Sequence, residues 1–173
     1  MVFGFGIRFI YKLGQQATKL ASMTAQQLDQ SIGSLLCESE KTCLGIDRKT
    51  VKRNDVTFFG LKVINILQPT TFSVKVTLSK GLDKDGDTIT TPPPLTDYLF
   101  HSPEEKFITL SRNEERNIGI GVEVLKEAKS GTYIFDVAVC YNDGIGDPPD
   151  SKCGGVGFEP DIYSFKKFYV VVP

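Results

Sequence analysis

The sequence has no tryptophan and a single histidine, His101. A zinc site built from histidines, or a Ser-His-Asp triad, would have to use that one residue. The sequence also has no block of basic residues, because 20 lysines and arginines are spread along the chain and balanced by 21 acidic residues. A concentrated basic surface is the signature of nucleic-acid binding. We therefore expect no nucleic-acid partner, no cofactor and no enzymatic activity.

A long hydrophobic run is absent as well. The most apolar stretch, residues 2–13, is interrupted by two glycines, Arg8 and Lys12. It is too short and too charged to span a bilayer, which takes about 20 apolar residues. It also lacks the small-residue cleavage site of a secretory signal. Membrane contact is therefore expected only through residues 1–13 or through an apolar segment upstream of Met1.

The four cysteines contain no C-x-x-C motif, so zinc-binding and thioredoxin-like interpretations lack their usual spacing. Each pair flanks a polar loop, which favours two local disulfides, Cys37–Cys43 and Cys140–Cys153, among the three connectivities that four cysteines allow. Four reduced thiols in a cytosolic protein are the alternative. Disulfides imply an oxidising compartment, so we expect an extracellular protein at the cell surface.

Up to about residue 40, apolar residues recur every three or four positions, the period of an amphipathic helix. The pattern predicts one long helix over residues 8–36, within an N-terminal unit of residues 1–40. Its apolar stripe contains Ile10, Leu13, Ala17, Leu20, Leu28, Ile32 and Leu35. A helix of about 29 residues is about 43 Å long, which is longer than a small sandwich needs to cover one sheet. We therefore expect this stripe to mediate assembly with another chain.

From residue 41 to residue 173 the period becomes two, as in strands with one buried face. The segments that fit strands are residues 44–51, 56–67, 72–79, 107–110, 117–124, 133–140 and 163–172. Turn signals separate them, among them residues 111–114 and Gly131, where glycine supplies a conformation that a residue with a Cβ resists. About seven short alternating strands predict an immunoglobulin-like antiparallel β-sandwich. The chain is thus expected to be mainly β, with one long N-terminal amphipathic helix.

Two long stretches, residues 80–106 and 142–161, are predicted to be loops at the ends or edges of the sheets. Loops of this length are uncommon unless they have a function. In an assembly they are natural contact sites.

Three aspartates in the first of these loops, Asp83, Asp85 and Asp87, alternate as at the start of a calcium-binding loop. That motif requires glycine at the sixth position and glutamate at the twelfth, where this chain has Thr88 and Pro94. They are a weak calcium candidate, and a solvated Asp/Gly hairpin loop is the alternative.

Two glycines, Gly119 and Gly121, alternate within one predicted strand. They do not precede a helix, so they are not a phosphate-binding loop. Glycine within a strand often marks the close approach of another backbone. A helix or a neighbouring subunit could lie on this smooth face, or a tyrosine or phenylalanine could cover it.

Two stretches resemble known families. Residues 107–124 (FITLSRNEERNIGIGVEV) and 128–139 (AKSGTYIFDVAV) resemble the paired strands of immunoglobulin-like modules in archaeal and bacterial surface proteins. Residues 13–30 (LGQQATKLASMTAQQLDQ) resemble the part of archaeal type IV pilin-like proteins that follows the membrane-spanning segment. This second family includes pilins, archaellins and archaellum-anchoring proteins. The resemblance implies one N-terminal helix carrying a sandwich head, although the uninterrupted apolar start of the family is missing here.

The resemblance implies a structural subunit or accessory of an extracellular surface filament. The helix would serve assembly or anchoring, and the sandwich would be exposed. The expected partners are further copies of the chain or other surface and filament proteins. The alternative is a monomeric surface binding or adhesion module that acts through its two long loops.

Overall fold

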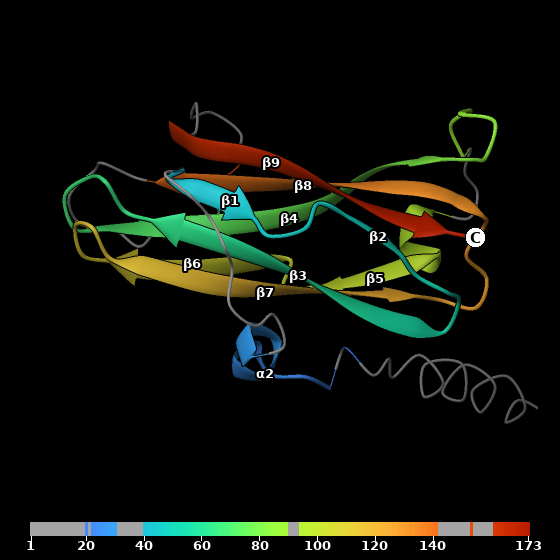
Figure 1. Cartoon of the computed structure of the whole chain (residues 1–173), viewed down its shortest axis with the longest axis horizontal. Helices are drawn as coiled ribbons and strands as arrows, with labels where there is room; N and C mark the ends of the chain where they lie inside the picture. Colours follow the sequence, from blue (N-terminus) through green and yellow to red (C-terminus); the bar gives the residue numbers. More distant parts are fainter. Residues whose placement is uncertain (1–19, 21, 31–39, 90–93, 142–152, 154–160) are drawn as a thin grey trace, which may run out of the picture.

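The computed structural model describes residues 20, 22–30, 40–89, 94–141, 153 and 161–173 of the chain. Two β-sheets lie face to face as a sandwich, and a short helix, α2 (Ala25–Gln30), lies against the outer surface of one of them (Figure 1). The four-stranded sheet has the order β1 (Thr42–Leu44), β3 (Asp55–Ile64), β7 (Glu115–Val124) and β5 (Leu99–Ser102). The five-stranded sheet has the order β2 (Arg48–Thr50), β9 (Asp161–Val172), β8 (Gly131–Tyr141), β4 (Thr70–Leu82) and β6 (Glu105–Leu110). The fold is therefore mainly β.

The alternating segments form strands because each buries one face in the space between the sheets. In β7, the side chains of Ile118, Ile120 and Val122 are fully buried in this core. Strands β3 and β7 pair antiparallel along their whole length. Gly131 has a φ of +153°, and a Cβ there would lie 2.2 Å from the Leu82 carbonyl oxygen. The predicted need for glycine at this turn is confirmed.

Aromatic rings fill the centre of the core. Phe135 and Phe168, both in the five-stranded sheet, are stacked with ring centroids 4.7 Å apart. Phe59, in the four-stranded sheet, lies 4.2 Å from Phe168. Because these rings come from both sheets, they hold the two layers together.

The order of the strands is that of an immunoglobulin domain. Such a domain has strands A, B, E and D in one sheet and strands C, F and G in the other. Strands β1, β3, β7 and β5 take the first set of places, and β4, β8 and β9 take the second. Near the start of β8, the Tyr133 hydroxyl donates a hydrogen bond to the Lys129 carbonyl oxygen at 3.0 Å, which is the tyrosine corner of this fold. The predicted immunoglobulin-like β-sandwich is confirmed.

The predicted strand boundaries need two corrections. The segment 44–51 is not one strand, because the chain changes sheets between β1, which pairs with β3, and β2, which runs parallel to β9. The stretch 80–106 is not all loop, because it contains β5 and the 3-10 helix η1 (Leu95–Asp97). Strands of three or four residues are too short for a period of two to be recognised. The described part of the chain thus has nine strands.

The prediction of one continuous helix over residues 8–36 is wrong in its middle. Leu20 and Ser22 lie in turns, and α2 begins only at Ala25. Thr24 starts this helix through a capping box: its N–H donates to Gln27 Oε1 at 2.8 Å, and the Gln27 N–H donates to Thr24 Oγ1 at 3.3 Å. The apolar period continues across this break, so periodicity alone does not reveal it. Within the described residues, no helix is long and apolar enough to span a membrane.

Candidate functional site

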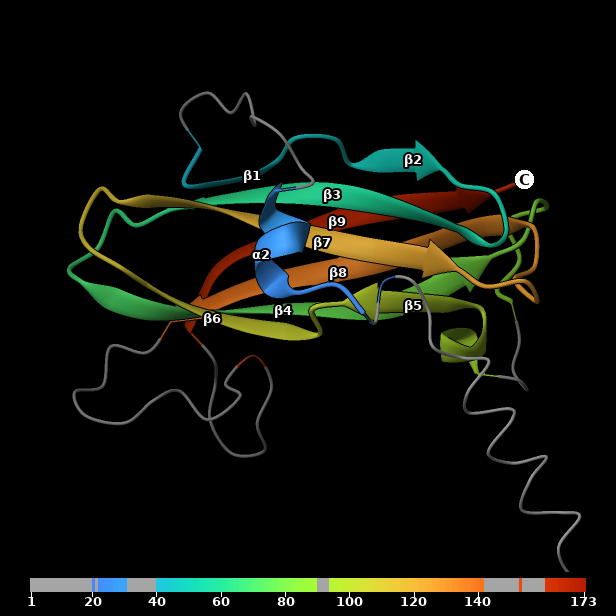
Figure 2. The same ribbon diagram turned by 90° about the horizontal axis from the view of Figure 1, so that it is seen from below.

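The site with the most specific geometry lies on the outer face of the four-stranded sheet, where α2 crosses β7 (Figure 2). We call the described residues from Leu20 to Gln30 the N-terminal segment. We call the surface that receives it, formed by Gly119, Gly121, Glu123 and Lys106, the docking site. Leu20 is 0% exposed and Leu28 is 1% exposed. The N-terminal segment is thus firmly packed on the sandwich.

The two glycines of β7 allow the N-terminal segment to approach the sheet. A Cβ at Gly119 would lie 2.1 Å from the Leu28 carbonyl oxygen, and one at Gly121 would lie 2.2 Å from Leu20 Cδ1. Opposite Gly119, on β3, lies Gly60, which is also buried. Of the alternatives that the sequence left open for Gly119 and Gly121, the structure shows a helix of the same chain at Gly119 and the side chain of Leu20 at Gly121.

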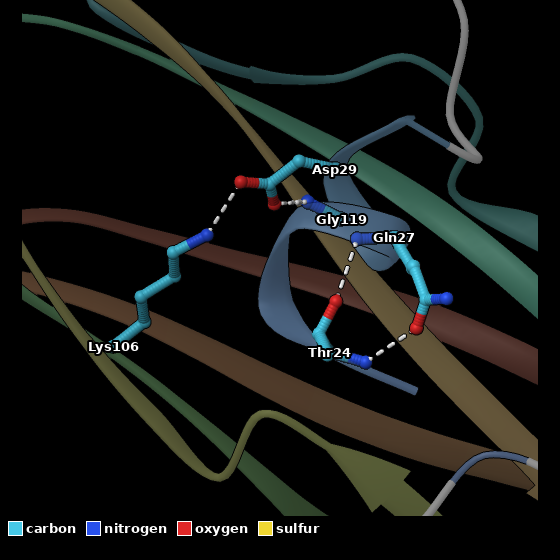
Figure 3. A network of polar contacts seen from close by, with 5 residues as sticks. All are labelled: Thr24, Gln27, Asp29, Lys106 and Gly119. Atoms are coloured by element: carbon cyan, nitrogen blue, oxygen red, sulfur yellow. Dashed lines mark hydrogen bonds and ion pairs between the residues drawn. The ribbon is translucent and has the colours of Figure 1, made fainter. Parts of the chain in front are cut away.

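Asp29 supplies the polar contacts at the centre of the docking site (Figure 3). Its Oδ1 accepts a hydrogen bond from the Gly119 N–H at 2.8 Å, and its Oδ2 accepts one from Lys106 Nζ at 2.6 Å. Strand β5 pairs with β7 only as far as Ser102 opposite Gly121, so no β5 residue pairs with Gly119. Asp29 therefore accepts the hydrogen bond from the Gly119 N–H, which has no partner in β5. Through Lys106 it also joins β7 to β6 in the other sheet.

A second carboxylate holds the start of the N-terminal segment. Glu123 is 8% exposed, and its Oε2 accepts a hydrogen bond from the Leu20 N–H at 3.2 Å. A buried carboxylate is costly unless it is hydrogen-bonded. The Leu20 N–H therefore offsets part of the cost of burying Glu123, and Glu123 fixes the position of Leu20. The sequence gives no sign of Asp29, because its partners lie 77 and 90 residues away.

The docking site is separate from the hydrophobic core. The core cluster runs from Val51 to Val172 and contains neither Leu20 nor Leu28. Burial of one leucine contributes about 1.5–3 kcal/mol before ordering costs. Apolar burial thus acts together with the hydrogen bonds of Asp29 and Glu123 to hold the N-terminal segment, while the core cluster is closed without it.

Of the predicted assembly residues, the structure describes Leu20 and Leu28, and it packs both against their own sandwich. The two do not lie on one helix, because Leu20 is in a turn and α2 begins only at Ala25. Their contact with another chain stays a prediction. The other five, Ile10, Leu13, Ala17, Ile32 and Leu35, lie outside the described residues.

The predicted disulfide between Cys140 and Cys153 is confirmed, with Cα atoms 5.7 Å apart. Cys43 is also disulfide-bonded, and Cys37, its predicted partner, lies outside the described residues. A disulfide of this kind persists in oxidising compartments. The bridge thus indicates a secreted or periplasmic protein.

In the weak calcium candidate, Asp83, Asp85 and Asp87, one carboxylate is hydrogen-bonded to backbone N–H groups of the same turn. Asp83 Oδ1 accepts hydrogen bonds from the N–H groups of Asp85 and Asp87, both at 2.9 Å. The side chains of Asp85 and Asp87 are exposed. Among the residues that the structure describes, no three His, Cys, Asp or Glu side chains are grouped to hold a metal ion. The geometry is that of a hydrogen-bonded Asp/Gly turn.

His101 lies in β5 with its ring against the core. Its ring centroid is 5.4 Å from that of Phe135, and its Nε2 lies 3.1 Å from the Val76 carbonyl oxygen. Burial lowers the pKa of His101 below its ordinary value of 6.5, and the Val76 hydrogen bond and the Glu104 charge oppose this shift. The residue is thus a partly buried structural histidine.

The two predicted contact loops begin at opposite ends of the sandwich. The first follows Leu82, which lies opposite Thr132 at the start of β8. The second follows Tyr141, at the other end of that 11-residue strand. Such a strand is about 35 Å long, which separates the points where the two loops begin. The first stretch returns at β6, where Lys106 pairs with Val74 and Val74 pairs with Val139, near the end of β8 at which the second loop begins.

No family model and no curated protein matches the chain. Among solved structures, the chain is similar to a family 123 glycoside hydrolase from Clostridium perfringens, with 12% identity and a TM-score of 0.43 over 72% of this chain and 22% of that one. It is similar to PapD-like domain 7 of human CEP192, with 15% identity and a TM-score of 0.41 over 81% and 93%. The class 5 fimbriae chaperone CfaA gives 11% identity and a TM-score of 0.41 over 76% and 54%. The strand order and the tyrosine corner define the class: a disulfide-bonded immunoglobulin-like β-sandwich with a docked N-terminal segment.

Proposed function

We propose that the chain is a non-enzymatic structural subunit or accessory of an extracellular surface filament. In this proposal the residues upstream of the docked segment serve assembly or anchoring, and the sandwich faces the medium. The observation that carries the proposal is the docking site, where N-terminal residues are fixed to the outer face of a sandwich whose core is already closed.

The docking contacts support this proposal for a mechanical reason. A subunit of an assembly has to hold its exposed head in a fixed orientation relative to the part that contacts its neighbours. Asp29 bonds to β7 in one sheet and to Lys106 of β6 in the other, and Leu28 is buried against β7. These contacts hold the N-terminal segment in place on the sandwich.

The predicted assembly residues divide into two groups in this proposal. Leu20 and Leu28 hold the head, because both are buried on it. Ile10, Leu13 and Ala17, upstream of the docked segment, and Ile32 and Leu35, downstream of it, remain the residues predicted to contact other copies or other filament proteins. Burying each larger apolar side chain supplies about 1.5 kcal/mol or more to assembly.

Negative-stain microscopy of the concentrated full-length chain tests the proposal. We expect filaments or ordered oligomers, which disappear when Ile10 and Leu13 are both changed to Asp. The control is Ile66→Asp, because Ile66 is a sandwich isoleucine that is 53% exposed and should not alter assembly. A chain that stays monomeric at every concentration, with its N-terminal segment docked, would contradict the proposal.

A further inference from the structure

We infer that the docking site also joins copies of this chain, by accepting residues 20–30 of a second copy in place of its own. The inference deepens the proposed function and rests on it for its biological purpose, since it names a contact through which neighbouring subunits connect. Exchange of an identical element between copies is a low-cost route to association.

The N-terminal segment can leave without opening the core. Leu20 and Leu28 are buried, but the core cluster of the sandwich contains neither. Release of the segment uncovers the outer face of β7 and leaves the packing between the sheets in place. The segment therefore binds to an already folded sandwich, as a separate peptide ligand would.

The docking site is specific for the groups that occupy it. The docking site offers a glycine surface for the backbone at Leu28, a carboxylate for the Leu20 N–H, and an N–H and an ammonium group for Asp29. An unrelated apolar helix would leave Gly119 and Lys106 without their acceptor. These requirements are met by residues 20–30 of this sequence, so a second copy is the partner that fits.

The chain between α2 and β1 has to span only a short distance across the sheet. Strands β1 and β7 are separated by one strand, β3, so the chain has to cross about 10 Å of sheet between α2 and β1. Residues 31–36 alone, upstream of the predicted Cys37–Cys43 bridge, span about 20 Å when extended. This length permits docking within one chain without strain, so the connection does not by itself favour exchange.

The contacts are the same whether the segment comes from the same chain or from another, so concentration decides between the two. A short tether gives an effective concentration in the millimolar range. A dilute copy should therefore keep its own segment, and copies crowded together should exchange.

Two full-length variants with one defect each test the inference. Gly119→Ala blocks the docking site, because its Cβ would lie 2.1 Å from the Leu28 carbonyl oxygen, and leaves the N-terminal segment intact. Leu28→Asp spoils the segment and leaves the docking site intact. Neither variant can dock its own segment, but in a mixture the segment of the first can occupy the site of the second.

We expect each variant alone to sediment as a monomer and the mixture to contain a dimer with one copy of each. In isotopically labelled Leu28→Asp chain, the NMR signal of the Gly119 N–H should move toward its wild-type position as unlabelled Gly119→Ala chain is added, up to about 1 mM. The matched control replaces the added chain with the double variant Gly119→Ala/Leu28→Asp, which should cause no change. Thermal unfolding of each variant verifies that the sandwich is folded.

Two results would overturn the inference: no dimer and no shift at about 1 mM, or an equal shift with the double variant. Failure of the inference is distinguishable from failure of the proposed function. If the wild-type chain forms filaments but the two variants form no mixed dimer, only the inference of segment exchange is rejected. If the two variants form mixed dimers but the wild-type chain never assembles into filaments, only the proposed filament function is rejected.

Discussion

Two glycines that alternate on β7 tolerate a side chain to different degrees. At Gly119 a Cβ would meet backbone, the Leu28 carbonyl oxygen at 2.1 Å, whereas at Gly121 it would meet the end of the Leu20 side chain at 2.2 Å. Backbone in a docked helix cannot move aside, but a leucine can change its rotamer. The same substitution should therefore have different effects at neighbouring positions.

We expect Gly119→Ala to weaken docking by about 3 kcal/mol, the burial of one leucine, and Gly121→Ala to weaken it by about 1 kcal/mol. Hydrogen exchange of the Leu28 amide, which donates to the Thr24 carbonyl oxygen at 3.0 Å, measures this directly. Gly81→Ala is the control, because its Cβ would meet only side chains, at 3.1–3.3 Å. Unchanged protection of Leu28 in Gly119→Ala would show that the segment docks differently.

His101 gives the stability of the protein a pH dependence with a definite sign. Burial lowers its pKa in the folded state below 6.5. Between that lowered pKa and 6.5, the unfolded chain binds more protons than the folded chain. The contribution of His101 to the free energy of unfolding is thus fully present above about pH 6.5 and is lost as the pH falls through the folded-state pKa.

The test compares wild type with His101→Gln in denaturant unfolding at about pH 7.5, 6 and 5. The free energy of unfolding of wild type should fall more steeply with decreasing pH than that of the variant. Because His101 is the single histidine in the sequence, the difference between the two slopes belongs to this residue. Parallel slopes would contradict the assignment.

At the scale of elements, α2 depends on its surroundings. A helix of six residues is far too short to be stable alone in water. The Thr24–Gln27 capping box satisfies two N–H groups at its start, and Leu28 and Asp29 attach it to β7. Capping, packing and the carboxylate contact therefore act together, and loss of one weakens the others.

The Cys140–Cys153 bridge joins the end of β8 to the residues that follow it. Closing a loop of about 14 residues contributes about 3 kcal/mol in the chain-entropy model, so changing both cysteines to Ser should lower the free energy of unfolding by about that amount. Chemical denaturation measures the loss, and wild type treated with reductant should lose at least as much. A loss below about 1 kcal/mol would mean that the unfolded chain is not constrained by the bridge in this way.

At the scale of the whole molecule, two buried regions are independent of each other. One is the core between the sheets, and the other is the docking site on the outer face of the four-stranded sheet. A protein built in this way can change the occupant of its outer site without unfolding. This independence underlies both the proposed function and the exchange between copies.

Features that depend on neighbouring residues could be predicted from the sequence. Alternation over Ile118, Ile120 and Val122 predicted a strand because every second side chain faces the core. Gly131 and the turn at residues 111–114, where Asn113 has a φ of +62°, were predictable from local backbone preferences. The spacing of Cys140 and Cys153 likewise predicted their bridge.

The position of the N-terminal segment could not be predicted from the sequence, because it depends on contacts between distant residues. Periodicity reports that Leu20 and Leu28 seek burial, but the same period fits a long helix facing another chain and a broken one docked on its own sandwich. Gly119 and Gly121 predicted a close approach without naming what approaches. Asp29, Lys106 and Glu123 became a site because folding brings together residues that are far apart in the sequence, and no local pattern records such contacts.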